Sequence, residues 1–146
     1  MNLSYAPSMR KLLALPDRRV EKRAAILRLQ DEAAKLPQVG ADVLEEHFAP
    51  HVYSRTVRLS PGLYIGGTHR HEHITIVTGK CTVFTEFGEQ EIDGHEVFKA
   101  PAGTKRAVLV HDRTTWTTIH PTEETDAEKI RAEVIMADLL LEAETS

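Results

Sequence analysis

Residues able to hold a metal ion gather in one short stretch of this sequence, "GGTHRHEH". Three histidines and a glutamate stand within five positions there, at His69, His71, Glu72 and His73. Imidazole and carboxylate groups are common ligands of divalent transition metals. The stretch leads straight into an apolar run typical of a β-strand. Two interpretations stay open: a metal site, or a polar rim of solvated or interface histidines at the mouth of a β-structure.

Strand alternation separates Glu72 from the three histidines. Side chains along a strand point to its two faces in turn, so Glu72 shares a face with Ile74 and Ile76. Because these isoleucines resemble core lining, we expect Glu72 to point into the protein. The histidines fall on the opposite face. A backbone bulge near Gly66-Gly67, which glycine permits, would be needed to turn His69 inward.

The elements that must position these residues are short strands separated by glycine and proline. From about residue 52 polar and apolar side chains alternate, and turn residues recur at Gly79, Gly88, Gly94 and in the segment 101–103. Many short strands with closely spaced turns are typical of a β-sandwich or barrel. We expect strands at about 52–60, 63–65, 74–77, 81–86, 90–92, 96–100, 107–111 and 116–120.

Helices are expected on both sides of these strands. From Asp17, a candidate N-cap, to Leu36 apolar side chains recur at three- and four-residue steps, and Pro37 ends the pattern. This apolar stripe must cover the outside of the strands or a second copy of the chain. A second helix is expected over about 125–141, where "TEETDAEKI" supplies capping residues. The chain then divides into an extended arm (1–16), an amphipathic helix (17–36), a β-barrel (37–124) and a C-terminal helix with a tail (125–146).

The bulk composition excludes several classes of protein. A chain of 146 residues with 27% charged and 41% hydrophobic residues is typical of one globular domain. Its formal net charge of −4 argues against a nucleic-acid or membrane-surface binder, because such proteins carry a basic excess. No apolar run reaches membrane-spanning length, and the N-terminus lacks the pattern of a signal peptide. The single cysteine, Cys81, rules out an internal disulfide and is interpreted as a packed thiol, so a reducing cytoplasm is expected.

The region from Tyr53 to His120 resembles a small single-domain cupin. The spacing from Glu72 to Gly79 matches the second half of the first cupin motif, and the second motif follows at Gly94, Pro101 and Gly103, with one extra residue between Gly94 and Pro101. The resemblance implies a double-stranded β-helix, or jelly-roll barrel. A wider stretch, roughly 36 to 135, is similar to a group of small cupins common in tailed-phage genomes.

The resemblance also implies a set of metal ligands. In metal-binding cupins two histidines and a glutamate of the first motif and a histidine of the second hold Fe, Mn, Ni or Zn. Those positions here are Gly66, Thr68, Glu72 and Arg106, so a strict match keeps one ligand of four. Later strands that surround the same cavity could supply others. The candidate ligands are His69, His71, Glu72, His73, His111 and His120.

A barrel without a metal is the alternative for the same positions. Arginine stays protonated and cannot bind a cation, so Arg106 cannot replace the missing histidine. It could form a charge-assisted, bidentate pair with Glu72 across the barrel interior. The hypothesis is that this ion pair stands where the metal stands in other cupins.

Two functions from different classes follow. The first is a non-catalytic cupin that acts as a structural or binding component, of a phage particle or another symmetric assembly. The second is a metal-dependent enzyme, of the dioxygenase or sugar isomerase and epimerase type, acting on a small molecule that the sequence does not specify. A small-ligand sensor is a third hypothesis. Since cupins commonly pair sheet to sheet, a homodimer or higher oligomer is expected, with virion proteins as further partners and the host cytoplasm or the virion as location.

Overall fold

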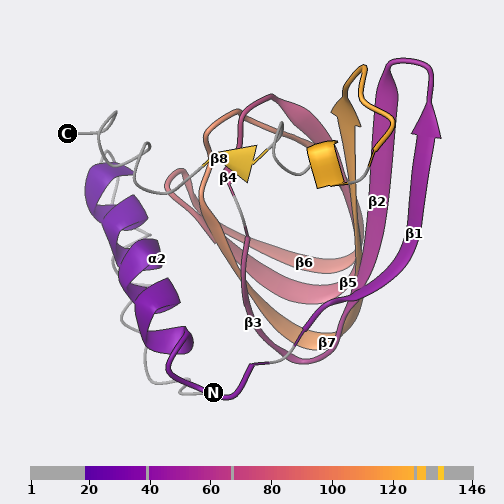
Figure 1. The fold of residues 1–146 in the computed structure, drawn as a ribbon. Helices are drawn as coiled ribbons and strands as arrows, with labels where there is room; N and C mark the ends of the chain where they lie inside the picture. The colour runs from indigo at the N-terminus through magenta and orange to yellow at the C-terminus, as the bar shows by residue number, and fades with distance from the viewer. Residues whose placement is uncertain (1–18, 39, 67, 127, 131–134, 137–146) are drawn as a thin grey trace.

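The computed structural model describes residues 19–38, 40–66, 68–126, 128–130 and 135–136, and a curved antiparallel sheet forms its centre (Figure 1). The strands run in the order β1-β2-β7-β5-β6, and β3 pairs with β7 beside this path. The sheet bends round to enclose a core between its two ends. The all-β core with a flanking helix that was predicted from the sequence is confirmed. The six strands are β1 (Asp42–Ala49), β2 (Val52–Leu59), β3 (Gly62–Ile65), β5 (His73–Thr85), β6 (Gly88–Ala100) and β7 (Arg106–Pro121).

Three of these strands, β5, β6 and β7, are longer than predicted, and in β5 and β6 a glycine that was expected to end the strand lies within it. Strand β5 joins the predicted segments 74–77 and 81–86 through Gly79. The pairing of β5 with β7 shifts register at this point, as in a β-bulge. Gly79 has φ +150°, and a Cβ added there would collide with Thr114 Oγ1 and lie 2.7 Å from Thr114 Cα. The absence of a side chain at Gly79 therefore lets the backbones of β5 and β7 lie close together at the bend of the sheet.

The inner face of the sheet carries the main hydrophobic core. Its members are buried residues from β2, β5, β6 and β7. Cys81 lies within this core, and its burial, with the nearby charge of Glu91, raises the pKa of the thiol to about 11. The side chain is therefore a packed, protonated thiol, as the sequence indicated. The core is formed by Leu59, Val77, Cys81, Val83, Ile92, Val108, Val110 and Trp116.

Helix α2 (Arg19–Ala33) covers the outer face of the sheet (Figure 1). Its buried residues Ala25, Ile26 and Leu29 pack against Phe84 of β5 and Ala107 of β7. The apolar stripe predicted over 17–36 thus rests on the chain's own barrel. The proposed cap Asp17 and the proposed arm 1–16 lie outside the described residues.

The predicted C-terminal helix over 125–141 is wrong at Ile135–Met136. A helical turn does begin where the capping sequence placed it, because Asp126 Oδ1 accepts hydrogen bonds from the backbone N–H groups of Glu128 and Lys129. Further on, Ile135–Met136 forms strand β8 and pairs antiparallel with β4 (Thr68–His69), so the backbone groups of this segment meet a distant strand rather than a helical turn. The rest of the predicted helix is not described, apart from 125–126 and 128–130. Within the described part of the chain, no helix has the length and apolar character to cross a membrane.

Candidate metal centre

Three histidines from separate strands meet at one end of the barrel. His69 lies on β4, His73 begins β5, and His120 stands next to the last residue of β7. One ring nitrogen of each lies within 4.8 Å of the others. The ring centroids are 4.4 Å apart for His69 and His73, 4.7 Å for His69 and His120, and 4.6 Å for His73 and His120. Such a triangle of imidazoles is a candidate site for a transition metal.

Strand pairing explains why His73 and His120 meet. Ile74 of β5 stands opposite Ile119 of β7. One residue further along each antiparallel strand, His73 and His120 therefore lie side by side on the same face. His69 arrives from β4, where the backbone N–H of Gly103 donates a hydrogen bond of 2.9 Å to its carbonyl. The separate strand β4, rather than a bulge within β5, brings His69 to the cluster.

The expectation that Glu72 points into the barrel is wrong. The buried residues at the start of β5 are His73, Thr75 and Val77, whereas Ile74 is 38% exposed on the outer face. Glu72 precedes the strand and lies at the surface, where its carboxylate accepts from Lys99 Nζ at 3.3 Å. The parity argument failed because it treated an exposed apolar residue as core lining.

The hypothesis of a Glu72–Arg106 pair fails for the same reason. Arg106 is 4% exposed and points into the barrel, while the Glu72 side chain is 55% exposed on the outside. Two further candidate ligands, His71 and His111, are also exposed and lie outside the cluster. His111 Nε2 shares a hydrogen bond of 2.8 Å with the Thr82 hydroxyl. The structure thus brings together three of the six predicted ligands.

The clustered imidazoles are neutral at neutral pH. Burial, reinforced by the neighbouring histidines and by Arg106, lowers the pKa of His69 to about 2 and that of His120 to about 4. Burial also lowers the pKa of His73, against the opposing effect of its hydrogen bond with the His71 carbonyl. A neutral imidazole offers a lone pair, which is the form that binds a metal ion.

The partners of each ring fit the role of a metal ligand. His73 Nδ1 lies 3.2 Å from the His71 carbonyl oxygen, so Nδ1–H donates to it and Nε2 carries the lone pair. Metal-binding histidines typically use such a carbonyl to fix ring orientation. The Nδ1 atoms of His69 and His120 are buried without any hydrogen-bond partner. Leaving such atoms unpaired is costly, and a bound cation would satisfy them.

The spacing also fits a metal ion after small side-chain rotations. In a tetrahedral site, bonds of about 2.0–2.1 Å place two ligand nitrogens about 3.3–3.4 Å apart. The candidate nitrogens lie within 4.8 Å of one another, so the most distant pair needs to close by up to about 1.5 Å. Three imidazole ligands leave at least one coordination position free, which is the arrangement of catalytic rather than structural sites.

Arg106 lies beside the three histidines. Its Nη2 is 3.5 Å from His73 Nε2, and its guanidinium carbon lies 5.5 Å from the centre of the Trp116 ring. Burial lowers its pKa to about 10, so the side chain stays charged at neutral pH. Gly66 leaves room for it, since a Cβ at Gly66 would come within 3.1 Å of Arg106 Cγ. The glycine interpreted above as a possible bulge therefore accommodates the arginine.

Comparison with known proteins finds similar folds only among solved structures. No protein-family model and no curated protein matches this chain. A cupin-2 domain containing protein from Shewanella frigidimarina is 13% identical and has a TM-score of 0.46, over 64% of this chain and 92% of that chain. A cupin domain from Bordetella pertussis is 20% identical with a TM-score of 0.44, over 60% of this chain and 98% of that one. A Cupin 2 conserved barrel domain protein from Salinispora arenicola is 16% identical with a TM-score of 0.43, over 64% and 80%. The resemblance to proteins of tailed phages stays a prediction.

Proposed function

We propose that this protein is a metal-dependent enzyme that acts on a small molecule, with a divalent transition metal held by His69, His73 and His120. The observation that carries the proposal is the buried triangle of neutral imidazoles, whose ring nitrogens lie within 4.8 Å of one another. Imidazole ligands suit Fe, Ni or Zn, and Mn belongs to the candidates by resemblance to cupins. A bound metal would polarise a substrate oxygen or lower the pKa of a bound water.

The protein's own residues have separate roles in this proposal. The carbonyl of His71 holds the His73 ring in one orientation through Nδ1–H. Val77 and Trp116 belong to the apolar core, and the Trp116 ring lies against Arg106 beside the histidines. Two hollows, which share Lys99 in their lining, are lined by residues of the centre. One, of about 240 Å³, is lined by His73 and His120, and the other, of about 340 Å³, is lined by Arg106.

Metal analysis of untagged protein tests the proposal. We expect about one equivalent of a transition metal per chain, and a Co²⁺ titration of the stripped protein should give a visible spectrum typical of nitrogen ligands. The variants His73→Ala and His120→Ala should lose both signals. His111→Ala and His71→Ala are matched controls, because these exposed histidines lie outside the cluster, and both should keep the metal. Retention of stoichiometric metal by both His73→Ala and His120→Ala contradicts the proposal.

A role in a symmetric assembly is a second candidate. Apolar side chains are exposed on the edge strand β1 and on the outer face of β5 and β6, where Ile74 is 38% and Val97 is 56% exposed. Such apolar patches beside open strand edges are typical of interfaces between copies of a chain. Light scattering of the protein against Val97→Glu tests this: a dimer or larger species should dissociate in the variant. A wild-type protein that is monomeric at all concentrations excludes this function, and a virion role stays a prediction.

A further inference from the structure

Arg106 is a buried cation without a carboxylate partner among the described residues. Its side chain contacts a neutral histidine and the face of Trp116, and neither group compensates a positive charge as a carboxylate does. An uncompensated buried charge costs several kcal/mol, about 3–5 where a partner has been removed from a buried pair. A buried arginine of this kind is a candidate binding group for an anion, with which it forms charge-assisted hydrogen bonds.

A pocket of about 340 Å³ opens directly onto Arg106. Its walls are largely apolar, with Val83, Phe87, Phe98 and Pro101 among the lining residues. Besides Arg106, the polar lining residues are Thr85, Gln90 and Thr104, with Lys99 and Glu89 also part of the lining. A mostly apolar hollow of this size with a few convergent polar groups is the usual form of a small-molecule site.

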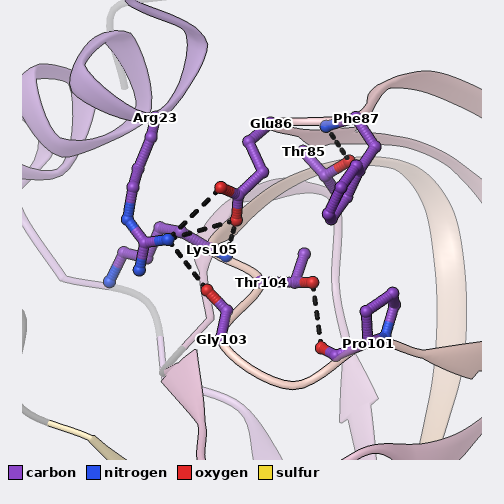
Figure 2. Close-up of polar contacts among 8 residues, drawn as sticks. All are labelled: Arg23, Thr85, Glu86, Phe87, Pro101, Gly103, Thr104 and Lys105. Atoms are coloured by element: carbon purple, nitrogen blue, oxygen red, sulfur yellow. Dashed lines mark hydrogen bonds and ion pairs between the residues drawn. The ribbon is translucent and has the colours of Figure 1, made fainter. Parts of the chain in front are cut away.

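The walls of this pocket are held in place by one buried ion pair (Figure 2). Arg23 of α2 donates from Nη1 to both carboxylate oxygens of Glu86, at 3.2 and 3.3 Å, and to the carbonyl of Gly103 at 2.9 Å. Glu86 stands between two lining residues of one wall. Its Oε1 also accepts from the backbone N–H of Lys105 at 3.2 Å, next to two lining residues of the other wall.

This network makes the pocket a preformed site. The two walls it joins are the turn after β5, which carries Glu86, and the loop before β7, which faces it in Figure 2. The same loop reaches the histidine cluster, since the N–H of Gly103 donates to the carbonyl of His69. A ligand that enters therefore meets fixed walls, and little ordering of the protein opposes binding.

We propose that this pocket binds a small organic carboxylate, whose charged group pairs with the guanidinium of Arg106. The planar fork of arginine matches the two oxygens of a carboxylate and can hold them through paired hydrogen bonds. The apolar walls suit a carbon skeleton. The pocket presents one buried cation, whereas a polyphosphate needs several, so a carboxylate fits the charge better than a phosphate ester. The proposal goes beyond the metal centre and does not require it, although Arg106 next to His73 would set a bound carboxylate close to that centre.

Trp116 provides the measurement, because it is the sole tryptophan of the chain and lies against Arg106. Metal-free protein would be titrated with benzoate, succinate, inorganic phosphate and the uncharged benzamide. Binding would be followed by tryptophan fluorescence and by isothermal titration calorimetry. We expect saturable binding of a carboxylate probe and at least about tenfold weaker binding of benzamide and phosphate. Arg106→Met should weaken carboxylate binding at least about tenfold, while Lys80→Met, which removes an exposed lysine outside the lining, should change it less than about threefold.

One further variant and one further measurement separate the possible failures. His120→Ala removes a proposed metal ligand and should keep carboxylate binding, so a loss of metal and a loss of the carboxylate site are distinguishable. Arg106→Met should also unfold at the same or a higher urea concentration than the wild type, since it removes an unpaired buried charge. Carboxylate binding that survives Arg106→Met overturns the proposal, as does the absence of saturable binding by every carboxylate probe. Tighter, Arg106-dependent binding of phosphate overturns the choice of carboxylate.

Discussion

Arg23 and Glu86 form a buried ion pair, and we expect replacement of Glu86 to lower the free energy of unfolding more than replacement of Arg23. Both side chains are almost fully buried, at 6% and 11% exposure. Arg23 already has two nitrogens, Nε and Nη2, that are buried without a hydrogen-bond partner. If Glu86 is replaced by glutamine, the guanidinium keeps the Gly103 carbonyl but loses its counter-charge. Removing one partner of a buried pair costs about 3–5 kcal/mol, and we expect Glu86→Gln to fall in this range.

Replacement of Arg23 should cost less. In Arg23→Met an apolar chain of similar length fills the space, and Glu86 keeps the hydrogen bond from the Lys105 backbone N–H. Glu86 also loses its counter-charge, but a carboxyl group can become neutral by taking up a proton, whereas a guanidinium stays charged. The loss of hydrogen bonds to a charged group then suggests about 1.5–3 kcal/mol. In the double variant Arg23→Met/Glu86→Gln no buried charge is left unpaired, so it should be more stable than Glu86→Gln alone.

Urea unfolding followed by circular dichroism gives the free energies for this comparison. The control is Glu32→Gln, which removes one partner of the exposed pair Lys35–Glu32 on the same helix. Surface pairs contribute about 0–1 kcal/mol, so this variant should shift the unfolding midpoint little. The reasoning is refuted if Glu86→Gln is no more destabilising than Glu32→Gln, or if the double variant is less stable than Glu86→Gln.

Two further predictions concern acid stability and the bend of the sheet. The pKa of His120 falls from 6.5 to about 4 on folding, so below pH 6.5 the unfolded chain binds a proton that the folded chain does not, and acid destabilises the metal-free protein. Between pH 6.5 and 4.5 this residue should lower the free energy of unfolding by about 2–3 kcal/mol. The variant His120→Gln should therefore lose less stability over this pH range than the wild type, whereas the exposed control His47→Gln should behave like the wild type. Parallel curves of unfolding free energy against pH for the wild type and His120→Gln would contradict the linkage. Gly79→Ala should destabilise the protein by about 1–3 kcal/mol more than Gly94→Ala in urea unfolding. Both glycines have positive φ, but only at Gly79 does a Cβ collide with Thr114. Equal losses of unfolding free energy in the two variants would therefore exclude the contact with Thr114 as the cause.

Local patterns predicted the fold class, although β1 was not among the expected strands and β8 lies where a helix was expected. Alternation with a period of two, together with glycine and proline, indicated the all-β core, and apolar spacing indicated the helix that became α2. The segment "TEETDAEKI" was also correctly predicted to cap a helix, and Asp126 is the capping residue. Capping can be predicted from sequence because it is a contact within one turn. The boundaries of β5 could not be predicted from the sequence. Gly79 lies at a bend within the strand, and the reason for a glycine there is the close approach of Thr114 on β7.

The candidate site was predictable only in part. The stretch "HRHEH" correctly drew attention to His69 and His73, but the orientation of Glu72 was wrong because Ile74 is exposed. His120 was named as one candidate of two on later strands, and the sequence held no reason to prefer it over His111. The register of β5 against β7 would have supplied that reason, since it sets His73 beside His120.

The sequence by itself determined the fold class, the helix that covers the barrel and the short stretch that carries two of the three clustered histidines. Only the tertiary structure decided which imidazoles meet, and that Arg106 lies buried beside them without Glu72. The physical reason is one of range. Side-chain alternation and capping are contacts between near neighbours in the chain, whereas strand register depends on packing between segments far apart in the sequence.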